Sequence, residues 1–301
     1  MSESVWAIVV TYNRRDLLQE CLDAVLAQTR AVDRILVVDN ASTDGTVPLL
    51  EREYPQVEIL ALPQNVGCAG GNHEGLKRAA ESPADWFWVM DDDTIPEPTA
   101  LENLLEPMTR LDGLPEPVIM ASKVLWTDGS IHEMSRPFPR WEPRSMSISA
   151  CERELMPLRA TTYVSMLVHR RAVVEYGVPM THYFIWGDDI EYTARILRHE
   201  FGYVAPRSVV LHKTKANYHP ARSDSLRYYY DVRNKLFMVR SDAWEPAEKF
   251  WLLVSGVYST MEYLAFNRFR ARNVAAVLRG VRDGLLQPAK GPTYAGLHAA
   301  A

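Results

Sequence analysis

The sequence has few cysteines and no excess of positive charge. Its three cysteines, Cys21, Cys68 and Cys151, are odd in number and widely spaced, so they predict neither a disulfide framework nor a cysteine-based zinc site. Unpaired cysteines are typical of a reducing compartment, and we therefore expect a cytoplasmic protein. The formal net charge of -5 argues against a general nucleic-acid-binding protein.

Long apolar runs are also missing. The N-terminus has no basic segment followed by an apolar core, as a signal peptide would have. No stretch of about 18 residues stays apolar throughout, which a membrane-spanning helix requires. The nearest approach, residues 250–266, is interrupted by three hydroxyl side chains and Glu262. The apolar content of 47% and the charged content of 24% are typical of a soluble globular protein.

The first half of the chain alternates short apolar runs with segments of helical spacing. Four runs are nearly all apolar and rich in β-branched or aromatic residues, as parallel strands buried on both faces are. They are residues 5–10, 34–39, 57–62 and 85–91. Helical spacing follows each of the first three. This order predicts an α/β fold with a parallel sheet and right-handed crossovers.

The second half is less regular. Residues 136–159 contain several prolines and little periodicity, which predicts a long loop or lid. Trp141 in this segment is interpreted as a buried anchor of the loop in preference to a surface for stacking a sugar. From Asp224 onward the pattern is helical. We expect a catalytic domain over residues 1–222 and a helical region over 223–301.

Polar residues follow each of the four predicted strands. They are residues 11–13, 39–42, 65–67 and 91–93, and all four groups contain acids or amides. In open α/β sheets, ligands bind beyond the carboxyl ends of the strands. The sequence therefore predicts a ligand site at this edge of the sheet.

Three adjacent carboxylates, Asp91 to Asp93, follow the fourth predicted strand. Their mutual repulsion is costly unless a cation compensates it, and Mg²⁺ or Mn²⁺ takes oxygen ligands and bridges to phosphates. A solvated acidic turn is the alternative interpretation, but the position after an apolar strand favours the metal. His212 ends a later predicted strand and can add an imidazole ligand, although a single histidine is more often structural.

Three further segments have two interpretations each. Asp39 can accept hydrogen bonds from a ribose or base, or it can form a turn. The glycine-rich residues 65–72 can bring backbone amides to a phosphate, but they match neither a dinucleotide fingerprint nor a Walker motif. Asp188 and Asp189 open a helical segment, where they either favour the helix dipole or supply a carboxylate base in a partly desolvated cleft.

In combination, these segments resemble the family-two glycosyltransferases, whose nucleotide-diphospho-sugar-binding fold is called GT-A. The matching segments run from about Val5 to about Lys213, with a weaker likeness over 227–234. In order they are VVTYNR, VVDNASTDGT, NVGCAGGN, DDD, VHRRAVVEYGVP, FIWGDDIEYTARI and LHKT. Several ordered motifs are more specific than any one of them. The resemblance implies a GT-A domain with a C-terminal helical extension.

The resemblance also implies roles for the matching residues. Asp91, Asp93 and His212 would hold Mn²⁺ or Mg²⁺. Asp189 would be the general base, with Asp188 beside it in the catalytic set. Trp186 and Gly187 would face the acceptor. The donor would be held by Thr11, Tyr12, Asn13, Arg15, Asp39, Asn65, Gly67, Gly70, Asp91 and Asp92.

The implied reaction is an inverting, metal-dependent transfer of a sugar from a nucleotide-diphosphate donor to a glycan or lipid-linked acceptor in cell-envelope polysaccharide synthesis. Bacterial galactofuranosyltransferases and rhamnosyltransferases are the most similar members. We favour UDP-galactofuranose, with dTDP-rhamnose as the alternative, because Gly187 separates Trp186 from the acid pair and departs from the galactofuranose pattern. The rivals from other classes are a sugar nucleotidyltransferase and a non-catalytic carbohydrate-binding protein.

The C-terminal region combines an apolar face with basic residues. Apolar side chains between Phe250 and Leu264 are followed by Arg268, Arg270, Arg272, Arg279 and Arg282. Basic amphipathic helices can lie on anionic membranes, which would suit a lipid-linked acceptor. Packing on the sheet or on a second subunit explains the pattern equally well. The sequence leaves open a peripheral contact at the inner face of the plasma membrane and a homo-oligomer.

Overall fold

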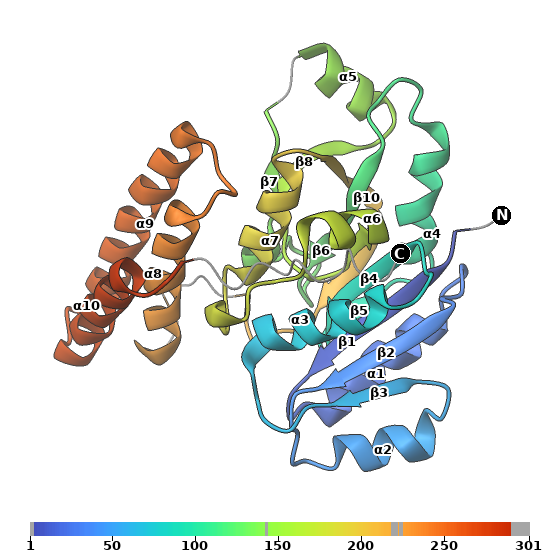
Figure 1. Cartoon of the computed structure of the whole chain (residues 1–301), viewed down its shortest axis with the longest axis horizontal. Coiled ribbons are helices and arrows are strands. Elements are labelled where there is room, and N and C mark those ends of the chain that lie inside the picture. The colour runs from blue at the N-terminus through green and yellow to red at the C-terminus, as the bar shows by residue number, and fades with distance from the viewer. Residues whose placement is uncertain (1–2, 142–143, 218–221, 223–224, 290–301) are drawn as a thin grey trace.

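The computed structural model describes residues 3–141, 144–217, 222 and 225–289 (Figure 1). The four strands expected in the first half are confirmed. They are β1 (Val5–Thr11), β2 (Arg34–Asp39), β3 (Glu58–Ala61) and β4 (Trp86–Asp91). They pair in parallel in the order β3-β2-β1-β4. Right-handed crossovers through helices require this arrangement of neighbouring parallel strands.

The rest of the ten-stranded sheet is mixed. Its strands are β5 (Thr94–Pro96), β6 (Pro117–Leu125), β7 (Phe138–Pro139), β8 (Met156–Ala160), β9 (Met166–His169) and β10 (Phe201–His212). The order continues from β4 through β9, β6, β10 and β8 to β7, and β5 pairs with β10. β9 is antiparallel to both of its neighbours, whereas β6 and β10 are parallel. The expected, mostly parallel sheet is therefore confirmed, and β9 and the short strands β5, β7 and β8 add the antiparallel pairings.

Helices cover both faces of the sheet. They are α1 (Arg15–Leu26), α2 (Thr46–Glu53), α3 (Gly67–Ala80), α4 (Ala100–Leu105), α5 (Arg144–Glu152), α6 (Arg170–Tyr176) and α7 (Asp188–Leu197). Alternate residues of a strand point to opposite faces. Ala7 of β1 belongs to one core cluster with Leu22 of α1, and Ile8 belongs to the other with Leu76 of α3. This alternation explains why β1 is buried along its whole length.

The expected lid over residues 136–159 is wrong. The segment contains β7, α5 and β8, and Ala150 of α5 is fully buried in the core. Proline has no N–H to donate, but its carbonyl can accept a hydrogen bond. The Arg140 amide accordingly donates to the Pro157 oxygen at 3.0 Å. Trp141 is 96% exposed, which contradicts its interpretation as a buried anchor.

Three helices form a separate unit beside the sheet: α8 (Ser225–Arg240), α9 (Pro246–Phe266) and α10 (Ala271–Leu286) (Figure 1). Tyr228 of α8 stacks on Tyr263 of α9 with ring centroids 3.5 Å apart. A β-carbon at Gly280 would lie 2.9 Å from the backbone oxygen of Tyr229, so glycine allows α10 to approach α8 closely. Among the described helices, none is long and apolar enough to cross a bilayer.

Candidate active site at the carboxyl edge of the sheet

The strand register gathers the predicted polar residues at one edge. Thr11 lies opposite Asp39, and Val10 lies opposite Asp91, so the ends of β1, β2 and β4 coincide. His212 ends β10 and pairs with Thr94 of β5, just after the acidic triplet. The structure therefore brings together residues that are more than one hundred positions apart in the sequence.

Asp91, Asp93 and His212 form one cluster. Their ligand atoms all lie within 4.8 Å of one another, and His212 Nε2 is 3.1 Å from Asp93 Oδ1. Two carboxylates and an imidazole form a donor set that suits a divalent ion such as Mn²⁺. The residues present therefore fit the metal that the sequence predicts, and the role of each as a ligand remains a prediction.

Burial and charge act in opposite directions on these carboxyl groups. Burial, together with the charge of Asp93, raises the pKa of Asp91. Burial alone would also raise the pKa of Asp93, but the hydrogen bond and charge of His212 and the charge of Arg14 hold it below its usual range. A divalent cation at this position would favour the ionised form of both carboxyl groups.

Asp92 is not one of the clustered ligand residues, and it accepts hydrogen bonds from the end of β1 and the residue after it. Its Oδ2 accepts a hydrogen bond of 2.8 Å from the Thr11 hydroxyl, and its burial raises its pKa to about 7 against the opposing charge of Arg14. The Arg14 guanidinium lies 3.2 Å from Asp92 and 2.5 Å from Asp93. Arg14 was not among the residues assigned from the sequence, whereas its neighbour Arg15 was. The signal was available, because three adjacent acids require a nearby cation.

The loops after β1 and β2 are joined by side chains predicted to hold the donor. Asn13 Oδ1 accepts a hydrogen bond of 2.7 Å from the Thr43 amide. Asp39 Oδ2 accepts one of 3.0 Å from the Ser42 amide, and its buried Oδ1 has no hydrogen-bond partner. Tyr12 between them is 44% exposed. One free carboxylate oxygen and one accessible aromatic ring are thus presented at this edge.

Arg15 lies beside this loop and not on the acidic triplet. Its backbone amide donates to Asp44 Oδ2 at 3.0 Å, and its guanidinium pairs with Asp16. Its side chain is exposed. Its predicted contact with the donor remains untested.

The glycine-rich turn before α3 packs against the loop that leads to α7. Gly67 has φ +77°, and a β-carbon there would lie 2.1 Å from the Phe184 oxygen. Asn65 Oδ1 caps the turn by accepting a hydrogen bond of 2.8 Å from the Gly67 amide. A β-carbon at Gly70 would lie 2.4 Å from the Val66 side chain. Packing explains these residues, and a contact with the donor remains a prediction for all three predicted positions.

The acid pair begins α7. Asp188 is buried, its Oδ2 has no hydrogen-bond partner, and burial with the charge of Asp189 raises its pKa well above the usual range. Asp189 is half-buried, and its Oδ1 accepts a hydrogen bond of 2.8 Å from the Ile190 amide. Burial raises the pKa of Asp189 to about 7, and the charge of Asp91 also raises it. Asp189 is therefore the member of the pair that ionises near neutral pH.

Asn234 of α8 holds the loop before the acid pair, and it was not among the site residues assigned from the sequence. Phe184, Trp186 and Gly187 all have positive φ. The buried Asn234 amide donates to the carbonyls of Tyr183, Ile185 and Trp186, at 3.0, 2.8 and 2.7 Å. The weak family likeness over 227–234 was the only sequence signal for this contact. The side chain links the C-terminal unit to the candidate base.

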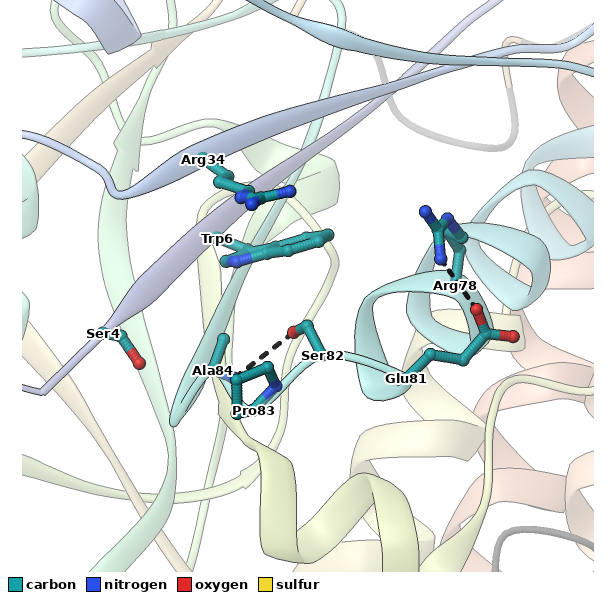
Figure 2. A pocket seen from close by; sticks show the side chains of 8 residues that line it. All are labelled: Ser4, Trp6, Arg34, Arg78, Glu81, Ser82, Pro83 and Ala84. Atoms are coloured by element: carbon teal, nitrogen blue, oxygen red, sulfur yellow. Dashed lines mark hydrogen bonds and ion pairs between the residues drawn. The ribbon is translucent and has the colours of Figure 1, made fainter. Parts of the chain in front are cut away.

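A second hollow lies at the opposite edge of the sheet (Figure 2). It encloses about 310 Å³ and is lined by residues next to the amino ends of β1 and β2, among them Ser4, Trp6 and Arg34. The Arg34 guanidinium lies 5.3 Å from the centre of the Trp6 ring. Figure 2 shows Arg78 paired with Glu81 at its rim. Its position at the amino edge separates it from the acidic cluster.

Comparisons with known proteins agree with this geometry. Residues 6–146 match the model of Glycosyl transferase family 2. The galactofuranosyltransferase GlfT1 of Mycobacterium tuberculosis is 31% identical over 205 residues, which are 66% of this chain and 66% of that protein. The match therefore spans slightly less than two thirds of this relative. The N-acetylglucosaminyl-diphospho-decaprenol L-rhamnosyltransferase of the same organism is 23% identical over 222 residues, 65% of this chain and 71% of that protein.

Two solved structures share the fold. TarS 1–349 of S. aureus in complex with UDP-GlcNAc has a TM-score of 0.61 at 14% identity, covering 94% of this chain and 80% of that one. GalNAc-T7 with UDP, GalNAc and Mn²⁺ has a TM-score of 0.57 at 12% identity, covering 84% and 54%. These neighbours confirm the expected GT-A fold. At such identities they are evidence for the fold alone.

Proposed function

Since the chain carries a glycosyl transferase family 2 domain, we propose that it is an inverting hexosyltransferase that uses a nucleotide-diphosphate sugar. The observation that supports this most directly is the cluster of Asp91, Asp93 and His212 next to a carboxyl group whose pKa is raised to about 7. The charge of Asp91 is felt at Asp189, so the cluster and the candidate base belong to one site. In this proposal, one site serves both the departing diphosphate of the donor and the deprotonation of the acceptor hydroxyl.

The donor that we favour is UDP-galactofuranose, and dTDP-rhamnose is the alternative. The relative at 31% identity is named a galactofuranosyltransferase, and the relative at 23% a rhamnosyltransferase. The unpartnered Asp39 Oδ1 supports a contact with the N–H or hydroxyl of the nucleoside, because a buried carboxylate oxygen otherwise stays unsatisfied. The exposed Tyr12 ring beside it supports stacking on the base.

Asp91, Asp93 and His212 would hold Mn²⁺ or Mg²⁺, and such an ion would supply positive charge for the departing diphosphate, an effect worth several kcal/mol in reactions of this kind. The Arg14 guanidinium pairs with Asp92 and Asp93 and already supplies one positive charge to the acidic triplet. A bound divalent cation would add to Arg14 in offsetting the three adjacent carboxylates.

Asp189 takes the proton from the acceptor hydroxyl as that oxygen attacks the anomeric carbon. A positioned general base contributes roughly 10²–10⁴-fold to the rate. Burial and the charge of Asp189 raise the pKa of Asp188, which disfavours a second negative charge beside the base. Trp186 and Gly187 lie directly before the pair, and their position in the sequence supports their assignment to the acceptor.

Residues 1–222 form the catalytic part in this proposal, and 223–301 provide contacts for the acceptor. The outer face of α9 carries exposed apolar side chains at helical spacing, including Trp251 at 67%, Val257 at 65% and Tyr258 at 72% exposure. These side chains are not packed on the sheet, as one interpretation of the sequence required. Exposed arginines follow at the end of α9 and along α10.

An aromatic and apolar face bordered by arginines matches the chemistry of an anionic membrane surface. We therefore propose a peripheral contact at the inner face of the plasma membrane, where a lipid-linked acceptor of cell-envelope polysaccharide synthesis would be presented. The face is complementary in both charge and polarity to such a lipid.

A screen of nucleotide sugars tests the proposed activity. We expect free nucleoside diphosphate to be released from one donor in the presence of acceptor and Mn²⁺, and EDTA should stop this release. Release of pyrophosphate would instead identify a sugar nucleotidyltransferase. If no donor raises the melting temperature with Mn²⁺ present, the protein is a non-catalytic member of the fold.

A further inference from the structure

A chain of hydrogen bonds lies behind His212, on the side away from Asp93. Ser135 Oγ is 3.1 Å from His212 Nδ1 and 3.0 Å from His132 Nδ1. His132 Nε2 is 2.9 Å from the hydroxyl of Thr214. His132 and Ser135 are 1% and 4% exposed. We call Ser135, His132 and Thr214 the relay.

The direction of the relay follows from its outer end. The Thr214 hydroxyl donates to the carbonyl of Ala216 at 3.0 Å, and a carbonyl can only accept. The Thr214 oxygen must therefore accept from His132 Nε2–H. A neutral imidazole carries one proton, so His132 Nδ1 is bare and accepts from the Ser135 hydroxyl. Ser135 has then used its only proton and accepts from His212 Nδ1–H.

Two features keep His132 neutral in this scheme. Its ring nitrogens contact hydroxyl groups, and a buried cation without a carboxylate partner is costly. Its ring also lies 4.4 Å from the ring of His212, at an interplanar angle of 35°. The same contact fixes the plane of the His212 ring.

We propose that the relay fixes one proton of His212 on Nδ1 and so presents the lone pair of Nε2 to a divalent cation. Without the relay, Asp93 Oδ1 at 3.1 Å from Nε2 would attract that proton, and the cation would have to displace it. The relay residues are positioning residues, since none of them is a metal ligand. The cation itself rests on the proposed function, whereas the position of the proton does not.

The position of the proton is tested in the metal-free protein labelled with ¹⁵N at histidine. Long-range ¹H–¹⁵N spectra distinguish protonated from bare ring nitrogens. We expect a protonated Nδ1 on His212, both alone and with UDP and diamagnetic Mg²⁺, and a protonated Nε2 with a bare Nδ1 on His132. A bare His212 Nδ1 in either state overturns the proposal.

The effect of the relay on cation affinity is tested with Mn²⁺ and UDP as probes. The concentration of free Mn²⁺ is measured by electron paramagnetic resonance. Substitutions beside a ligating histidine typically weaken metal binding 10–100-fold. We expect that loss for Ser135→Ala and a smaller loss for Thr214→Val. Thr214→Ser keeps the hydroxyl and should bind Mn²⁺ as the wild type does.

Ser122→Ala is the matched control. Ser122 is a buried serine in β6 that hydrogen-bonds to Ser165 and Ser208, and its loss should lower the melting temperature without changing Mn²⁺ affinity. Unchanged Mn²⁺ affinity in Ser135→Ala would overturn the relay. If the wild-type protein binds no Mn²⁺ at all, the proposed function fails, and the ¹⁵N spectra still decide where the proton of His212 lies.

Discussion

Replacing Asp189 with asparagine tests the candidate base most directly. Asparagine keeps the shape of the side chain and its acceptor oxygen for the Ile190 amide, which is 2.8 Å away, but it cannot accept the proton of the acceptor. Loss of a general base costs roughly 10²–10⁴-fold in rate, which corresponds to about 3–5 kcal/mol of activation free energy. The donor affinity should stay unchanged, because the donor is held by other residues in our proposal.

The assay compares turnover with donor binding. Turnover is measured as release of nucleoside diphosphate, and the donor dissociation constant by calorimetry with Mn²⁺ present. Asp128→Asn is the control, because Asp128 is a carboxyl group in an exposed turn that hydrogen-bonds to Ser130. If Asp189→Asn lowers turnover and donor affinity by the same factor, or keeps more than about a tenth of the activity, the base assignment is wrong.

The raised pKa of Asp189 also predicts a pH profile. Because the pKa is about 7, the carboxylate that acts as base forms as the pH rises through that value. Turnover should therefore rise from pH 6 to pH 8. The charge of Asp91 contributes to the raised pKa, so a bound cation that offsets this charge should move the rise to lower pH. The rise should be missing in Asp189→Asn, and its persistence there would assign it to another group.

Four further changes test other parts of the site. Asp93→Ala should abolish the Mn²⁺-dependent part of donor affinity, because it removes a ligand from the cluster. The measurement is the donor dissociation constant by calorimetry, with and without EDTA. If EDTA changes donor affinity equally in the wild type and the variant, the prediction is wrong. Gly67→Ala should lower the melting temperature far more than Gly129→Ala, since both glycines have positive φ but only the first would clash with a backbone oxygen. Asn234→Ala should leave the carbonyls of Ile185 and Trp186 without the Asn234 amide, while the Tyr183 carbonyl keeps Arg233 as a donor; the change should destabilise the protein by about 1–3 kcal/mol in urea unfolding and lower kcat more than donor affinity. Trp251→Ser should weaken co-sedimentation of the full chain with anionic vesicles and leave donor hydrolysis in solution unchanged; equal sedimentation of both proteins would argue against the membrane contact.

The sequence predicted the first half of the fold better than the second. β1, β2, β3 and β4 are short and almost entirely apolar because both of their faces are covered, and this pattern needs no knowledge of distant contacts. β9 also lies inside the sheet, but its direction depends on its neighbours β4 and β6. A run of four residues contains no information about direction.

The same difference applies to the site. Asp91, Asp93 and His212 follow strands, so their meeting could be expected once the strands share an edge. Asn234 lies in the middle of a helix, and apart from the weak family likeness over 227–234, its sequence does not indicate that it reaches the three carbonyls before α7. Ser135 directly precedes residues 136–159, a segment without clear periodicity. Contacts of this kind depend on how separate units pack together, which local patterns do not encode.

The hydrogen bonds from Asn234 to the loop before α7 have a practical consequence for experiments with truncated chains. A polypeptide cut after residue 222 would retain the acidic triplet, His212 and the acid pair, yet it would lack the amide that holds the carbonyls of Tyr183, Ile185 and Trp186. Such a shortened chain should still capture manganese while failing to turn over. We therefore expect the C-terminal helices to contribute to catalysis, so that deleting them would impair both turnover and membrane attachment.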